Sequence, residues 1–103
     1  MNEINILFLN VLKYKDKETG EYKTRFAYLL NDDKAKQNTD NLKGVSEYSY
    51  YCDGTQLFEK MNGSDALTPM KLVVEQRPSM RNPLKTVTII KTVITKHATI
   101  ELL

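Results

Sequence analysis

Aromatic residues are interleaved with cations along residues 13–28, and three more tyrosines follow within residues 48–51. This pattern of residue types suits the binding of an unpaired nucleic-acid strand. Cations follow the phosphates, and flat rings stack on exposed bases at roughly 1–3 kcal/mol per base. Tyrosine fits the task because its ring accepts a base while its hydroxyl tolerates water. The elements that carry these residues must therefore present them on one surface.

Six tyrosines and three phenylalanines cannot all serve as stacking platforms, because a small β domain also needs rings in its core. Three phenylalanines are assigned to the interior, namely Phe8, Phe26 and Phe58. The alternation of side chains could place three tyrosines there as well, namely Tyr28, Tyr48 and Tyr50. The rings expected at the surface are Tyr14, Tyr22 and Tyr51. Exposed aromatic residues often mark binding surfaces, so ligand contact by one or two tyrosines is expected.

The charge is unevenly spread along the chain, although the net charge is only +2. Residues 1–75 carry ten basic and twelve acidic side chains. Residues 76–100 contain no acid and five cations, Arg77, Arg81, Lys85, Lys91 and Lys96. A cationic field of this kind attracts a polyanion at short range even on a nearly neutral protein. The alternative interpretation is an ordinary solvated face of a sheet.

The sequence lacks the residue patterns of common enzymes and metal sites. His97 and Cys52 are the only histidine and cysteine, and neither has an identifiable catalytic partner. Asp32 and Asp33 lie among lysines and asparagines, which is typical of a solvated loop rather than of a closed cation site. We therefore expect no enzyme activity, no metal and no cofactor. With no disulfide, no leader pattern and no apolar run of about 20 residues, a cytoplasmic location without a membrane is expected.

Apolar and β-branched residues predict five strands and one helix within a single domain spanning residues 1–103. The strands are expected at residues 5–14, 21–30, 45–52, 70–76 and 85–95, and the short helix at 54–63. A hairpin turn is expected at residues 15–20, an exposed loop at 31–44 and a proline-containing loop at 77–83. The tail from residue 98 either continues the last strand or forms a sixth. The order β-β-β-α-β-β predicts a mostly-β, five-stranded OB-type barrel with one short helix.

Two segments resemble OB-fold single-stranded DNA-binding proteins, of the compact type that phages, plasmids and mobile elements carry. Residues 13–23 are similar to the charged, Thr-Gly-containing first hairpin of that family, and residues 57–75 to its helix and fourth strand. The resemblance implies that DNA lies across the second and third strands, with the first hairpin and the last loop closing over it. The nucleic-acid-binding residues that it nominates are Lys13, Lys15, Lys17, Tyr22, Lys23, Arg25, Tyr48, Tyr51, Arg77, Arg81 and Lys85.

The expected function is non-catalytic, sequence-tolerant binding of single-stranded DNA in replication or recombination of a phage or mobile element. RNA is left open as a partner. A homodimer or a higher homo-oligomer is expected, because the apolar strand at residues 86–94 and the tail would otherwise leave an exposed edge. The alternative function is a small β-barrel module for protein–protein interaction or inhibition. The acid-free stretch favours the polyanion, because protein partners do not require it.

Overall fold

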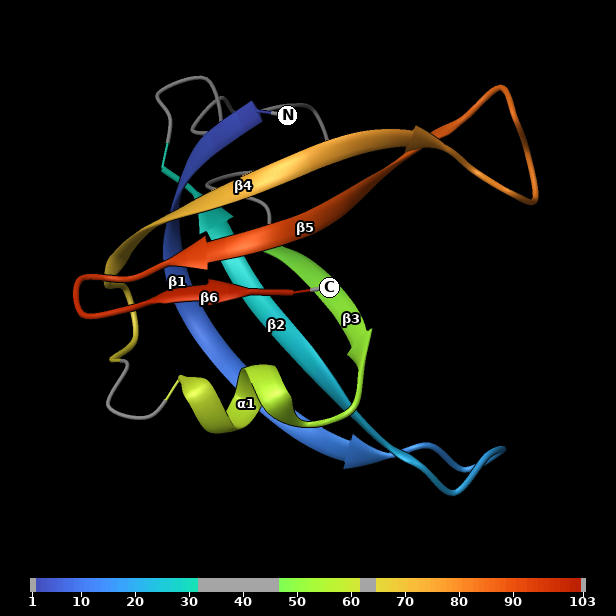
Figure 1. Cartoon of the computed structure of the whole chain (residues 1–103), viewed down its shortest axis with the longest axis horizontal. Coiled ribbons are helices and arrows are strands. Elements are labelled where there is room, and N and C mark those ends of the chain that lie inside the picture. The colour runs from blue at the N-terminus through green and yellow to red at the C-terminus, as the bar shows by residue number, and fades with distance from the viewer. Residues whose placement is uncertain (1, 32–46, 62–64, 103) are drawn as a thin grey trace, which may run out of the picture.

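A long first strand joins the two halves of the fold in a computed structural model that describes residues 2–31, 47–61 and 65–102 (Figure 1). The elements in chain order are β1 (Asn2–Lys15), β2 (Tyr22–Leu30), β3 (Glu47–Asp53), α1 (Gln56–Lys60), β4 (Pro69–Pro78), β5 (Thr86–Ile94) and β6 (Thr99–Glu101). The six strands form one antiparallel sheet in the order β3-β2-β1-β4-β5-β6. The sheet curls into a half-barrel, and α1 lies below its lower end (Figure 1).

The curl begins in β1, which pairs with β4 through its first half and with β2 through its second half. The register shifts between Phe8 and Asn10, so Leu9 is an extra residue opposite β2. Such a bulge bends a strand and increases its twist. The bend allows one strand to serve both halves of the sheet, and the core fills the concave side between them.

Strand β2 shows how the sequence pattern becomes a core. The side chains of Thr24, Phe26 and Tyr28 point to the concave side and are buried, as the alternation predicts. The Phe26 ring lies 5.6 Å from the Phe8 ring and 5.7 Å from the Tyr28 ring, between ring centres. The hydroxyl of Thr24 donates a hydrogen bond of 2.7 Å to the Gly54 carbonyl, which satisfies a buried polar group. This bond also ties the end of β3 to β2.

The mostly-β, barrel-like class with a short helix is confirmed, but the described residues form six strands where five were predicted. The tail forms its own strand because a turn at residues 95–98, closed by Thr95 and Ala98, reverses the chain. Strand β4 runs on to Pro78, beyond its predicted end at residue 76. Proline is tolerated in this last position, where it pairs opposite Thr86.

The helix is shorter than predicted, beginning at Gln56 rather than at residue 54. The Thr55 hydroxyl donates to the Glu59 carboxylate at 3.3 Å and makes no side-chain cap to the backbone. The predicted end of the helix, the start of the third strand at residues 45–46 and the predicted loop after residue 31 lie outside the described residues.

Gly54 has a φ of +75° at the junction between β3 and α1, and its N–H donates to the Tyr22 carbonyl at 3.2 Å. An added Cβ would meet no atom within 4 Å, so the cost of a side chain here is purely conformational. Gly54→Ala is expected to lower the free energy of unfolding by about 1 kcal/mol, and Gly54→Asn by less. Urea denaturation measures both, and an alanine variant as stable as the parent would contradict this prediction.

Candidate nucleic-acid interface

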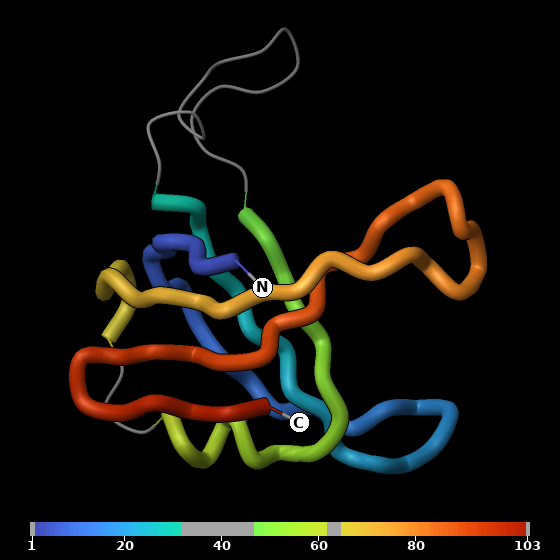
Figure 2. The backbone as a smooth tube through the Cα atoms, turned by 45° about the horizontal axis from the view of Figure 1, so that its top comes forward, coloured from blue at the N-terminus to red at the C-terminus, as the bar shows by residue number. Residues whose placement is uncertain are grey.

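Two hairpins project from the same side of the molecule, with β3 between them (Figures 1 and 2). The first hairpin joins β1 to β2 through residues 16–21, and the second joins β4 to β5 through residues 79–85. The sequence analysis nominated cations on both hairpins, although the first hairpin also carries Asp16, Glu18 and Glu21. The strands that carry them are antiparallel neighbours, so each hairpin extends the sheet outward beyond its core.

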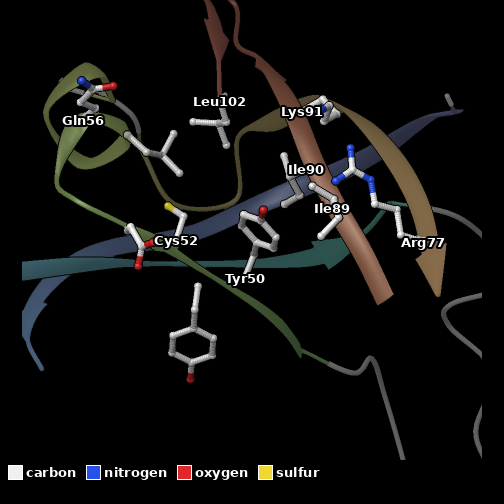
Figure 3. A pocket seen from close by; sticks show the side chains of 11 residues that line it. Tyr50, Cys52, Gln56, Arg77, Ile89, Ile90, Lys91 and Leu102 are labelled. Carbon is white, nitrogen blue, oxygen red and sulfur yellow. The ribbon is translucent and has the colours of Figure 1, made fainter. Parts of the chain in front are cut away.

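A cavity of about 410 Å³ opens between β3 and the strands β5 and β6, above α1 (Figure 3). Its lining combines rings, cations and apolar side chains: Tyr50, Tyr51, Cys52, Asp53, Gln56, Leu57, Arg77, Ile89, Ile90, Lys91 and Leu102. Figure 3 shows Tyr50 pointing across it from β3 toward Ile89 and Ile90 of β5. The cavity therefore brings the tyrosine strand and the acid-free stretch together.

The cavity exists because the curled sheet does not close. In the described ranges no backbone hydrogen bond joins β3 to β5 or β6, so β3 is an edge strand. Among the described residues, β5 pairs on its other side with β6 through Thr92, Val93 and Ile94, and the Leu102 N–H donates to the Lys91 carbonyl at 2.8 Å. The register of β5 against β4 also shifts, which makes Lys91 an extra residue in the strand. The first half of β5 thus faces β3 across an open seam.

Two neighbouring tyrosines on β3 point to opposite faces of the strand and lie in different environments. Tyr50 is half-buried, and burial raises the pKa of its hydroxyl, while the Ile90 amide and the Arg77 charge act in the opposite direction. Tyr51 is 59% exposed, and its ring meets Tyr14 edge to face with 6.3 Å between ring centres. The exposed, laterally supported ring of Tyr51 has the geometry of a stacking platform.

Ion pairing divides the eight nominated cations into two groups. Three are paired with carboxylates: Lys23 with Asp16 at 3.1 Å, Arg25 with Glu47 at 3.2 Å and Arg77 with Glu75 at 2.8 Å. The others are exposed and have no carboxylate of a described residue within 4.0 Å, namely Lys13, Lys15, Lys17, Arg81 and Lys85. Lys13 lies over the Phe58 ring, with 5.4 Å from its Nζ to the ring centre. The remaining four are the cations best placed to meet phosphates.

The shape of the first hairpin depends on Asp16. Its Oδ1 accepts the N–H of Glu18 at 2.7 Å and that of Thr19 at 3.2 Å, and Gly20 completes the turn with a φ of +73°. These bonds, followed by the contact with Lys23, lower the pKa of the Asp16 carboxyl. The same ion pair raises the pKa of Lys23. The charged pair therefore stabilises the hairpin at pH values between the ordinary pKa of an aspartate, 3.8, and that of a lysine, 10.5.

Asp16→Asn keeps an oxygen acceptor for the turn but removes the charge. Since the folded pKa of Asp16 is lowered, its stabilising effect is present above 3.8 and is lost as the pH falls below that value. The parent protein is therefore expected to be more stable than the variant at neutral pH, with the difference closing in acid. Urea unfolding midpoints measured from about pH 7 to about pH 3 test this. A constant difference across that range would contradict it.

The structure separates two of the nominated rings that the sequence analysis placed together on the third strand. Tyr48 and Tyr51 lie on opposite faces of β3, because residues three apart in a strand alternate. Tyr48 stacks on Tyr28 with 5.7 Å between ring centres, on the concave side, and does not line the cavity. Tyr22 is 54% exposed where β2 leaves the first hairpin. Tyr51 belongs to the strand that lines the cavity, but its ring lies on the convex face with Tyr14, opposite to Tyr50.

Sequence analysis missed two residues of the cavity. Tyr50 was one of three tyrosines that alternation could place in the core, and it is half-buried because no described strand pairs with the outer edge of β3. Lys91 belongs to the acid-free stretch but was not nominated, and the bulge places it 4.0 Å from Glu75 beside Arg77. The adjacent pair Ile89 and Ile90 interrupts the alternation of β5 and was the available signal for that bulge.

The part of the chain that the structure describes contains no group of three or more His, Cys, Asp or Glu side chains able to hold a metal ion. Burial, followed by the nearby Asp53 charge, raises the pKa of Cys52, which disfavours a reactive thiolate. Among the same residues, no helix has the length and apolar character needed to cross a membrane. Comparison with protein-family models, with curated proteins and with solved structures found no match.

Proposed function

We propose that this chain binds single-stranded DNA without catalysis, along a path from the first hairpin across β3 to the second hairpin. The observation that carries the proposal is the cavity in which Tyr50 of β3 meets Arg77 and Lys91 of the β4–β5 unit, while the same strand presents the exposed Tyr51 ring on its other face. Exposed rings beside cations are what an unpaired strand requires. The volume of about 410 Å³ is of the size that small-molecule groups such as a nucleotide occupy.

The distribution of charge supports the same path. Lys15 and Lys17 extend from the first hairpin, and Arg81 and Lys85 lie on the second. A strand crossing β3 between the hairpins would meet cations at both ends and tyrosines in the middle. Such contacts neutralise phosphates with little regard to sequence, so binding should be sequence-tolerant and should weaken steeply with salt.

The architecture is also consistent with an OB-type barrel, which we propose as the fold type. In OB domains the strand 2–3 face and the loops between strands 1–2 and 4–5 bind oligonucleotides. Here β2, β3 and the two hairpins occupy those positions in the chain order. Strand β6 is an addition to the five-stranded pattern. The resemblance of residues 13–23 and 57–75 to compact phage and mobile-element proteins suggests replication or recombination as the setting.

Fluorescence anisotropy with labelled oligo-dT, measured across a salt series, tests the proposal. Binding is expected at about 50 mM salt, with log affinity falling linearly against log salt. Duplex DNA and RNA of equal length serve as comparisons that show which kind of nucleic acid the protein prefers. Absence of oligo-dT binding at about 50 mM salt would discard the proposal.

A protein-interaction module remains the second candidate, and the open seam favours it. Within residues 47–61 and 65–102, one edge of β3 and the edge of the first half of β5 that faces away from β4 lack a partner strand. Such edges accept an extended peptide or a second copy of the chain as an added strand. The dimer expected from an exposed β5 edge is less needed where β6 covers it, with Ile100 buried. Sedimentation measured with and without oligo-dT separates self-association from DNA binding.

A further inference from the structure

Two large apolar side chains stand in solvent at the tip of the second hairpin. Met80 is fully exposed and Leu84 is 95% exposed, more than any other large apolar side chain of the described residues. Neither contributes to the core cluster, which is built from other residues of the sheet and from α1. Figure 1 shows this hairpin extending well beyond the body of the half-barrel. Their exposure therefore has no explanation in the packing of this chain.

The tip is held in shape by its own hydrogen bonds. The Ser79 N–H donates to the Lys85 carbonyl at 2.8 Å, and the Lys85 N–H donates to the Asn82 carbonyl at 2.9 Å. The Asn82 side chain accepts the Leu84 N–H at 3.2 Å, and Pro83 occupies the second position of this turn, which proline favours. Met80 and Leu84 are thus displayed on an ordered turn, so little backbone entropy is lost when they enter a partner.

The surroundings of the tip indicate what that partner is. Arg81 directly follows Met80 and Lys85 directly follows Leu84, and neither cation has a carboxylate of a described residue within 4.0 Å. No acid occurs anywhere in residues 76–100. Exposed apolar side chains beside cations are complementary to nucleic acid, where phosphates flank stacked bases, and Met and Leu are among the side chains that enter base steps. The second hairpin also lies at one end of the proposed DNA path.

We propose that Met80 and Leu84 insert between bases where single-stranded DNA meets a duplex, and that the second hairpin thereby opens the duplex. Arg81 and Lys85 hold the phosphates on either side of the opened step. This activity rests on the proposed function, because the single-stranded part of the DNA places the hairpin at the junction. It adds to that function by assigning the tip a role in strand separation.

The test uses a short duplex with a single-stranded oligo-dT tail, labelled with a fluorophore and a quencher at the junction. The double variant Met80→Ser/Leu84→Ser removes the wedge and leaves every cation in place. It is expected to bind tail-length oligo-dT within about twofold of the parent, but to need at least about tenfold more protein to open half of the duplex. Leu67→Ser is the matched control, since Leu67 is 58% exposed on a different turn and its loss should leave opening unchanged.

The other outcomes overturn the inference in distinguishable ways. If the double variant opens the duplex as well as the parent while both bind oligo-dT, the wedge is wrong and the proposed function stands. If the parent protein fails to bind oligo-dT, the proposed function and this inference are both wrong. If the double variant loses binding to vesicles containing phosphatidylglycerol but opens DNA normally, the tip inserts into lipid and the inference is wrong.

Discussion

Replacing Arg81 and Lys85 together by glutamine is expected to weaken oligo-dT binding by more than about tenfold at about 50 mM salt. Each cation that contacts a phosphate of a single strand adds about 0.7 to the slope of log affinity against log salt, so the slope should fall by about 1.4. These two residues are chosen because they are exposed on the second hairpin without a carboxylate partner among the described residues. Anisotropy titrations at several salt concentrations measure both quantities.

The matched control is the double variant Lys60→Gln/Lys71→Gln, which removes the same net charge. Lys60 lies on α1 and Lys71 on β4, both exposed and both away from the two hairpins. If binding depended only on net charge, the two double variants would lose affinity equally. The proposed path predicts that the control keeps its salt slope. An equal decrease of the salt slope in both double variants would show that no localised phosphate contacts exist at the second hairpin.

Tyr51→Ala is expected to weaken oligo-dT binding by about 5- to 150-fold, which corresponds to the roughly 1–3 kcal/mol of one base–aromatic stack. Tyr51 is 59% exposed and its ring contacts Tyr14, so its removal leaves the core untouched. Because stacking is not ionic, the salt slope should stay close to that of the parent. Affinity would therefore fall in parallel at every salt concentration, unlike in the variants that lack cations.

Two further variants identify the ring and the face responsible. Tyr51→Phe keeps the ring and should retain affinity within about twofold, since stacking requires no hydroxyl. Tyr48→Ala removes an exposed tyrosine from the same strand but from the concave side, where it stacks on Tyr28. Its unfolding midpoint must be recorded beside its affinity, because that stack contributes to packing. Equal losses of affinity for Tyr48→Ala and Tyr51→Ala, with both folded, would contradict base stacking on the exposed Tyr51 ring.

Part of the candidate site could be predicted because it depends on local rules. The turn at residues 16–20 follows from Asp16, whose side chain bonds the backbone two and three residues ahead, and from Gly20. The burial of Phe26 follows from strict alternation in β2. The same alternation already separates Tyr48 from Tyr51 onto opposite faces of β3.

Other features depend on contacts between distant segments. The bulges at Leu9 and Lys91 depend on which strands lie opposite, and neither a propensity nor a period of two specifies them. The pairing of Arg25 with Glu47 needs the register between β2 and β3, which brings together residues 22 apart in the chain. That register reduces the contribution of Arg25 to a cationic surface, which a count of charges along the sequence does not reveal.

By itself the sequence determined that the chain forms strands and a short helix. It also determined which rings alternate on β2 and where acids are missing. These properties arise within a few neighbouring residues. Only the tertiary structure decided that β3 and β5 face each other without pairing, that Tyr50 and Lys91 share a cavity with Tyr51 and Arg77, and that both hairpins project on one side. These features follow from the bend of β1 and the register of the whole sheet. Both depend on contacts between residues far apart in the chain.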